Sequence, residues 1–177
     1  MFMIAGYGSK PVFQYKFRPL IQDRRAPDGG FCVILYENRI LSFSTYDVNG
    51  AFIDELCFSL PGRVIQCFYG LLRNAMNWLG ATPCDLRGSE MSPYASSFAF
   101  DGYDPIRVWG INDLLLQPPG SEAGFFTRHL LVLFEDVANL FAESGINLTL
   151  DGFTWDPARI NPFRKSQLYA SRQQGVI

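Results

Sequence analysis

The most reactive side chains of this sequence are four cysteines and one histidine. Cys32, Cys57, Cys67 and Cys84 stand 25, 10 and 17 residues apart. None of these spacings is the close Cys-x-x-Cys pair of zinc sites and dithiol redox centres. The first three also lie in apolar stretches, which is typical of buried free thiols in a reducing compartment. We therefore expect a cytoplasmic protein without a metal site or a cofactor.

The single histidine, His129, would have to serve any Ser-His-Asp or Cys-His catalytic group. Helical spacing places it on one stripe with Val132, Asp136, Asn139 and Glu143, on the polar side of the expected helix. An exposed helix face is a poor place to activate a nucleophile. We therefore expect a surface or interface histidine and predict no catalytic residues.

Carboxylates are abundant in the second half of the chain. Residues 90–156 hold ten Asp and Glu against two Arg, whereas residues 1–25 hold five Lys and Arg against one acid, and residues 157–177 hold four against none. An acidic body repels phosphate backbones, so we expect no direct nucleic-acid binding by the main domain and a basic protein as partner. The alternative is that these acids only keep an apolar domain soluble.

Two related turns combine carboxylates with aromatic side chains. Residues 101–105 read Asp-Gly-Tyr-Asp-Pro, and residues 151–157 read Asp-Gly-Phe-Thr-Trp-Asp-Pro. Both lack the ligand set of a calcium loop. At one end of a sheet, and unneutralised by the basic termini, they would form an acidic aromatic patch suited to protein recognition. The predicted partner-binding residues are Asp101, Tyr103, Asp104, Asp113, Asp151, Trp155 and Asp156.

The composition indicates one compact domain. The chain has 177 residues, of which 48% are hydrophobic, 15% aromatic and 18% charged, so it is long enough to bury a sizeable core without a staple. No apolar run reaches the length of a membrane span. We expect a single α+β domain over residues 1–157, followed by a polar, basic C-terminal tail over residues 158–177.

The pattern of apolar and turn residues predicts the elements of this domain. We expect a mainly antiparallel sheet with two principal helices on one face. The expected strands are 31–37, 40–46, 51–59, 97–101, 106–116 and 146–154, and the helices run from a Ser59 cap to Gly80 and over 121–144. At helical spacing, Met76 and Trp78 are expected to belong to the core.

An internal repeat is a further hypothesis. Residues 53–62 and 111–120 share Ile, Leu, Pro and Gly at a constant offset, which would make residues 40–80 and 97–145 a duplicated β-β-α unit. Convergent turn chemistry is the alternative. Because a buried unpaired carboxylate is costly, we predict a β-bulge at Asp54 and Glu55 that turns both acids outward, with Asn112 and Asp113 behaving alike. Inward-facing pairs would instead form a carboxylate cluster.

Three functions remain open from the sequence. The first is a non-catalytic cytoplasmic protein-binding module, such as an inhibitor, immunity or counter-defence protein, whose acidic surface mimics phosphates before a basic partner. The second is a small-molecule-binding protein or enzyme with an aromatic pocket between the two β-β-α units. The third is a structural or assembly subunit, including a homodimer through the 121–144 helix, which is apolar nearly all round.

Overall fold

The computed structural model describes residues 8–19, 29–88, 94–118, 120–146, 148–150 and 153–154. In chain order the elements are β1 (Pro11–Pro19), β2 (Gly30–Tyr36), β3 (Ile40–Tyr46), β4 (Phe52–Ser59), α1 (Gly62–Leu79), β5 (Asp85–Arg87), β6 (Tyr94–Phe100), β7 (Ile106–Trp109), α2 (Ile111–Leu116), α3 (Glu122–Glu143), β8 (Thr149–Leu150) and β9 (Phe153–Thr154).

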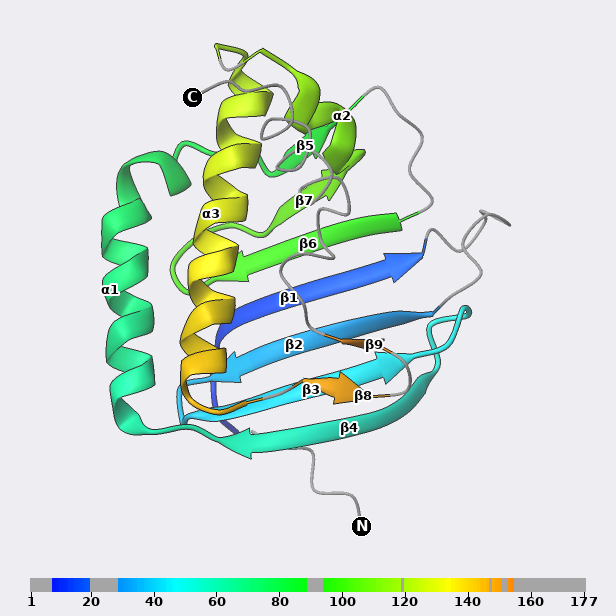
Figure 1. Cartoon of the computed structure of the whole chain (residues 1–177), viewed down its shortest axis with the longest axis vertical. Helices are drawn as coiled ribbons and strands as arrows, with labels where there is room; N and C mark the ends of the chain where they lie inside the picture. The colour runs from blue at the N-terminus through cyan, green and yellow to red at the C-terminus, as the bar shows by residue number, and fades with distance from the viewer. Residues whose placement is uncertain are drawn as a thin grey trace, which may run out of the picture.

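Seven strands form one sheet in the order β4-β3-β2-β1-β6-β7-β5 (Figure 1). Every neighbouring pair is antiparallel except β5 and β7, which are parallel. With α1 and α3 packed against it, this sheet confirms the predicted α+β architecture. The meander β2-β3-β4 follows the predicted strands closely, since the turn between β3 and β4 is closed by Asp47 and Gly50, the latter at a φ of +81°.

The strand β1 was missed by the sequence analysis, which expected no strand before residue 31. From Phe13 onward its side chains nonetheless alternate: Phe13 and Tyr15 are buried, while Lys16 and Arg18 are exposed. Successive side chains of a strand point to opposite faces, so this alternation separates a core face from a polar face. The strand lies in the middle of the sheet, between β2 and β6.

Both long helices pack on the same face of the sheet. The ring of Phe13 lies 6.0 Å from that of Phe68 in α1 and 6.3 Å from that of Phe141 in α3, measured between centroids. Figure 1 shows the two helices side by side, and each buries one apolar stripe. The helix α3 begins at the Ser121 cap, whose hydroxyl accepts from the Gly124 N–H at 3.2 Å. The helix α1 begins after Pro61 and has no side-chain cap, so the predicted Ser59 cap is wrong.

The predicted bulge is displaced by one residue. The register between β3 and β4 shifts where Tyr46 pairs with Phe52 and Thr45 with Asp54, so Ile53 is the extra residue. Asp54 is exposed as expected, but Glu55 is half-buried and accepts from the Ser42 hydroxyl at 2.5 Å. Glu55 thus points away from the helix-side core, in register with Ser44, but it is half-buried and not fully exposed, because hydroxyls of the neighbouring strand satisfy its carboxylate.

The second predicted unit departs from the first. Residues 111–116 form the helix α2 and not the end of a strand, because Gly110 adopts a φ of +63° that ends β7 and lets Leu114 enter the core. Asn112 and Asp113 are therefore helical and do not match the strand residues Asp54 and Glu55. The duplicated unit is not confirmed.

The described chain ends in two short strands. The predicted strand 146–154 is divided into β8 and β9, which pair with each other, and the preceding Leu148 enters the core. In Figure 1 this hairpin lies in front of the β2-β3 part of the sheet. The predicted tail, residues 158–177, lies outside the described residues. No helix of the described part combines the length and the apolar character needed to cross a membrane.

Candidate functional site

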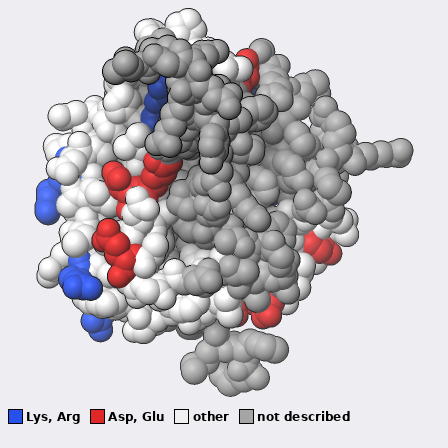
Figure 2. Space-filling view, in the orientation of Figure 1, with Lys and Arg blue, Asp and Glu red and all other residues white. Residues whose placement is uncertain are grey.

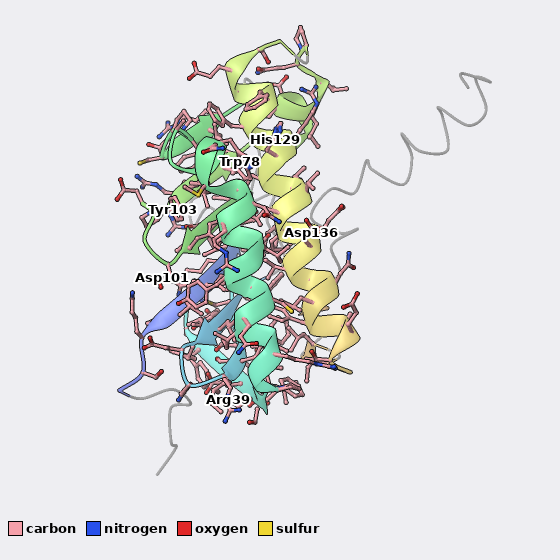
Figure 3. All side chains as sticks on the ribbon, turned by 90° about the vertical axis from the view of Figure 1, so that its left-hand side faces the viewer. Arg39, Trp78, Asp101, Tyr103, His129 and Asp136 are labelled. Carbon is pink, nitrogen blue, oxygen red and sulfur yellow. The ribbon has the colours of Figure 1, made fainter. Side chains whose placement is uncertain are left out.

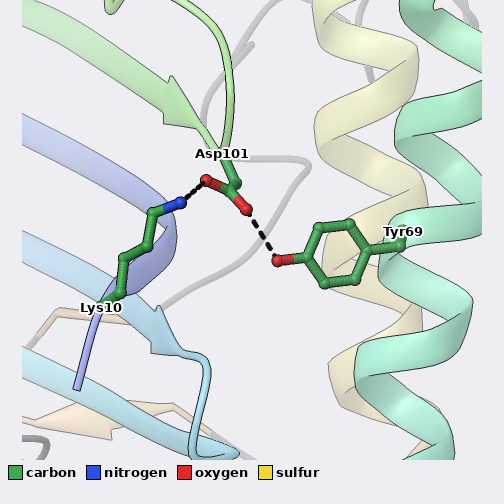
Figure 4. Close-up of polar contacts among 3 residues, drawn as sticks. All are labelled: Lys10, Tyr69 and Asp101. Carbon is green, nitrogen blue, oxygen red and sulfur yellow. Dashed lines mark hydrogen bonds and ion pairs between the residues drawn. The ribbon is translucent and has the colours of Figure 1, made fainter.

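The first predicted turn is held by a polar cluster of three residues (Figure 4). Asp101 follows β6, forms an ion pair with Lys10 and accepts a hydrogen bond from the Tyr69 hydroxyl of α1 at 2.8 Å. Its side chain is only 18% exposed. The bonds from Lys10 and Tyr69 hold the pKa of Asp101 below its usual range, while burial and the neighbouring carboxylate raise the pKa of Tyr69 to about 12. Asp101 thus ties α1 to the sheet, and its charge is neutralised by a cation of the basic N-terminal part.

The other predicted site residues have different surroundings. Tyr103 (Figure 3) is half-buried beside Gly80 at the end of α1. Asp104, on the same turn, is exposed. Asp113 is half-buried in the first turn of α2, against Gly88. Because β7 runs antiparallel to β6, α2 begins at the end of the strands opposite to Asp101. The structure therefore brings Asp101, Tyr103 and Asp104 together and separates Asp113 from them.

The remaining predicted residues, Asp151, Trp155 and Asp156, lie outside the described residues. The described part of the predicted patch therefore presents one exposed carboxylate, that of Asp104, beside the neutralised Asp101.

A different surface has the features of a binding site. Between α1 and α3 lies a groove of about 300 Å³ with a mainly apolar lining. Its walls come from the outer edges of the two apolar helix stripes. The lining residues are Leu71, Asn74, Ala75, Trp78, Arg128, His129, Val132, Leu133 and Asp136.

One end of this groove is an aromatic cluster. The His129 ring lies 4.1 Å from the Phe125 ring and 5.5 Å from the Trp78 ring, measured between centroids. Its Nδ1 donates to the carbonyl oxygen of Phe125 at 2.9 Å, which leaves Nε2 as an acceptor in the neutral ring. Figure 3 shows Trp78 and His129 facing each other across the two helices. The cluster offers flat apolar surface with a polar edge.

Several apolar side chains of the two helices remain exposed. Phe125 and Val132 of α3, on the groove side, are 40% and 56% exposed, whereas Met76, on the side of α1 away from the groove, is 55% exposed. The prediction that Met76 belongs to the core is therefore wrong, and Trp78 is only half-buried. For Trp78 the signal is its position four residues after Asn74, at the edge of the polar side of α1. For Met76 the signal is its position three residues after the exposed Arg73.

The charges of the two helices differ in sign. Within α3, Glu122, Glu135, Asp136 and Glu143 outnumber Arg128, whereas α1 carries two Arg and no acid. Figure 2 shows acidic side chains gathered over the part of this face that the helices occupy, with basic side chains toward its edge. The apolar groove therefore lies beside an acidic helix.

Arg128 has a structural task at the end of the groove. Its Nη2 donates to the carbonyl oxygens of Leu115 and Gln117, at 3.0 and 2.5 Å. These are carbonyls at the C-terminal end of α2, which a cation satisfies well. Arg128 thus fastens α2 to α3. Asp136 also lines the groove, and its side chain forms no hydrogen bond or ion pair with another described residue.

All four cysteines are free thiols, and only Cys32 is buried. The expectation of buried thiols is therefore wrong for Cys57 and Cys67, which are exposed like Cys84. Burial raises the pKa of the Cys32 thiol, and burial together with Glu55 raises that of Cys57 to about 11, so both disfavour the reactive thiolate. Within the described ranges, no group of three or more His, Cys, Asp or Glu side chains is placed to hold a metal ion.

Comparison with known proteins adds no family. A scan against models of protein families gives no match, and a search of curated proteins finds no similar sequence.

Proposed function

We propose that this chain is a non-catalytic protein-binding module whose α1-α3 groove holds a segment of a basic partner protein. The observation that carries the proposal is the combination of an apolar groove, exposed apolar residues at its sides and an acidic helix along it. An apolar centre with a polar rim is the usual anatomy of a protein interface.

The size of the groove favours a side-chain anchor. Its volume of about 300 Å³ stands at the lower limit of small-molecule pockets. One aromatic or aliphatic side chain of a partner would fill it against Trp78 and Val132. Anchors of this kind carry most of the binding energy in an interface.

The charge of α3 favours a basic segment around that anchor. Asp136 lines the groove, and Glu122 and Glu143 are exposed along the same helix. Lys and Arg side chains beside the anchor would meet these carboxylates, which speeds association and excludes acidic partners. The proposal keeps the acidic surface inferred from the sequence but moves its centre from the Asp101 turn to α3, because Lys10 already neutralises Asp101.

An inhibitor, immunity or counter-defence protein is the finer form of this proposal. Carboxylates along a helix resemble a row of phosphates, so an enzyme that grips nucleic acid would offer the basic surface that fits. The groove would then supply the specificity that charge alone lacks.

The test is site-specific photo-crosslinking in the native host. A photoreactive amino acid is placed at Val132 in the groove, and in a matched control at Ile53, which is 50% exposed on the edge strand β4. We expect one basic protein to be captured from Val132 only, and Asp136→Lys to reduce its yield. Adding salt should reduce the yield as well, since exposed charges are screened.

Three outcomes would contradict the proposal. Equal capture from both positions would indicate non-specific contact. Capture of a second copy of the chain, with a dimer seen by light scattering, would favour the assembly subunit. A large thermal stabilisation by a metabolite, lost in Val132→Glu, would favour the small-molecule alternative.

A further inference from the structure

The sheet face turned away from the helices carries a second hollow, independent of the proposed function. It measures about 270 Å³ and lies across β1, β2 and β3. The strand register places Lys16 beside Cys32, and Gly30 beside Tyr46. The lining residues are Lys16, Phe17, Arg18, Gly30, Phe31, Cys32, Tyr46, Asp47, Val48 and Gly50.

Two small residues, Gly30 and Cys32, lie at the centre of the hollow. A Cβ on Gly30 would stand 2.5 Å from the carbonyl oxygen of Phe17 and 3.2 Å from the Arg18 Cα, so any larger residue would collide with β1. Next to it, the Cys32 side chain is short and buried. The side chains of Lys16, Arg18 and Tyr46 therefore stand as walls around a low floor.

Two of these walls are cations without an ion-pair partner among the described residues. Lys16 and Arg18 are both exposed, and neither forms an ion pair or a hydrogen bond with its side chain to any described residue. Asp47 also lines the hollow, but its Oδ1 accepts from the Asn49 and Ala51 N–H groups at 2.8 Å and closes the β3-β4 turn. The balance of the hollow is positive.

We propose that this hollow binds a phosphate group, free or as the ester of a small molecule. An Arg guanidinium presents a planar fork that matches phosphate oxygens, and a Lys ammonium adds a second charge for a dianion. The Tyr46 ring on the opposite side gives flat surface to the organic part of an ester. The volume accommodates the phosphate and a small part of the ester, with the remainder in solvent.

The experiment titrates three probes into the full chain, followed by NMR and by thermal denaturation. The probes are inorganic phosphate, a nucleoside monophosphate and a short single-stranded oligonucleotide. We expect saturable shifts of Gly30 and Tyr46 amide signals with the first two, at millimolar concentrations or below. Loss of one charge-assisted contact costs roughly tenfold in affinity, so Arg18→Ala and Lys16→Ala should each weaken binding by about that factor. Arg63→Ala removes an equally exposed charge from α1 and should change nothing.

The first two probes distinguish free phosphate from a phosphate ester as the ligand. Equal affinity for phosphate and the monophosphate assigns the site to the free anion, and tighter binding of the monophosphate assigns it to an ester. The proposal is overturned by no saturable shift, by the same loss in Arg63→Ala as in Arg18→Ala, or by affinity for the oligonucleotide that grows with its length. The last result would indicate nucleic acid on this face.

Discussion

The α1-α3 groove and the sheet hollow described above have nearly the same volume, about 300 and about 270 Å³, and opposite chemistry. The groove between α1 and α3 has walls of apolar side chains and a carboxylate, Asp136. The sheet hollow has a floor of Gly30 and Cys32 and walls that include two cations, Lys16 and Arg18. The two sites therefore differ in the chemistry of their lining and not in their volume.

The difference comes from how each is built. Helices present side chains three and four residues apart, so the groove receives the edges of two apolar stripes and stays apolar. A strand sends alternate residues to opposite faces, so β1 gives Phe13 and Tyr15 to the core and Lys16 and Arg18 to the outer face. The core packed between the helices and the sheet supports both the groove and the sheet hollow. The charge of each is set by different residues.

The largest expected effect is on the free energy of unfolding, for a substitution in the core between the helices and the sheet. Phe134 is fully buried and lies 4.8 Å from the Tyr15 ring and 5.4 Å from the Phe98 ring, measured between centroids. Phe134→Ala should lower the free energy of unfolding by about 3–5 kcal/mol. Urea denaturation measures this. Phe125→Ala, on the same helix but at the groove, is the control and should cost about 1 kcal/mol or less. Equal losses would show that the groove side of α3 is part of the core.

The second prediction is a double dissociation between the hollows. Asp136→Lys should reduce crosslinking from Val132 and leave phosphate binding unchanged, whereas Arg18→Glu should abolish phosphate binding and leave crosslinking unchanged. Charge reversal at a rim changes affinity by roughly tenfold or more. Both readouts use the assays described above. A single variant that weakens both would mean that the faces are coupled.

The third prediction concerns Asp101, whose carboxylate is bonded to Lys10 and Tyr69, in contrast to the exposed Asp136. Lys10 and Tyr69 lower the pKa of Asp101, so folding favours its ionised form. Its contribution to stability is present above the unfolded pKa of about 3.9 and is lost as the pH falls through the lower folded value. Tyr69→Phe should therefore cost about 1 kcal/mol at pH 6 and less at pH 3, by urea denaturation.

The matched control for this cluster is Asp104→Asn, on the same turn. Asp104 is exposed, and we expect its variant to match the wild-type protein at both pH values. A pH dependence in Tyr69→Phe equal to that of the wild-type protein would contradict the assigned role of the Tyr69 bond.

The smallest effect is expected at Cys57, on the sheet face away from the helices. Burial, the charge of Glu55 and a hydrogen bond to it raise the pKa of Cys57 to about 11. Glu55→Gln removes the charge, so the thiolate fraction and the rate of reaction with a thiol-specific disulfide reagent at pH 8 should rise several-fold. Peptide mapping assigns the label to Cys57. Asp54→Asn, with an exposed neighbouring carboxylate, should leave the rate unchanged.

Most of the fold could be predicted from the sequence, because its signals are local. The meander, both long helices and the Gly80 and Gly145 helix ends follow from periodicity and turn residues. The strand β1 carried an equally clear alternation and was missed. The helix α2 was misread because Ile111–Leu116 lacks a clear period, and the positive φ of Gly110 decided its conformation.

The candidate site was harder to predict. The stripe of His129 and Asp136 was found on the α3 wheel, but nothing in the sequence shows that Trp78 of α1 lies across from it. The acidic turn at Asp101 was found as well, yet its charge is cancelled by Lys10, which lies far earlier in the chain. A count of carboxylates does not show which of them are neutralised.

The sequence by itself determined which residues face the core, since the periods of helix and strand relate each residue to neighbours two to four positions away. It also determined that α3 is acidic. Only the tertiary structure decided which charges stay free and where empty space remains. The Lys10-Asp101 pair, the α1-α3 groove and the hollow above Gly30 each join segments distant in the chain. Electrostatic energy and packing depend on distance in space, so these features appear only once the sheet has set the strand order.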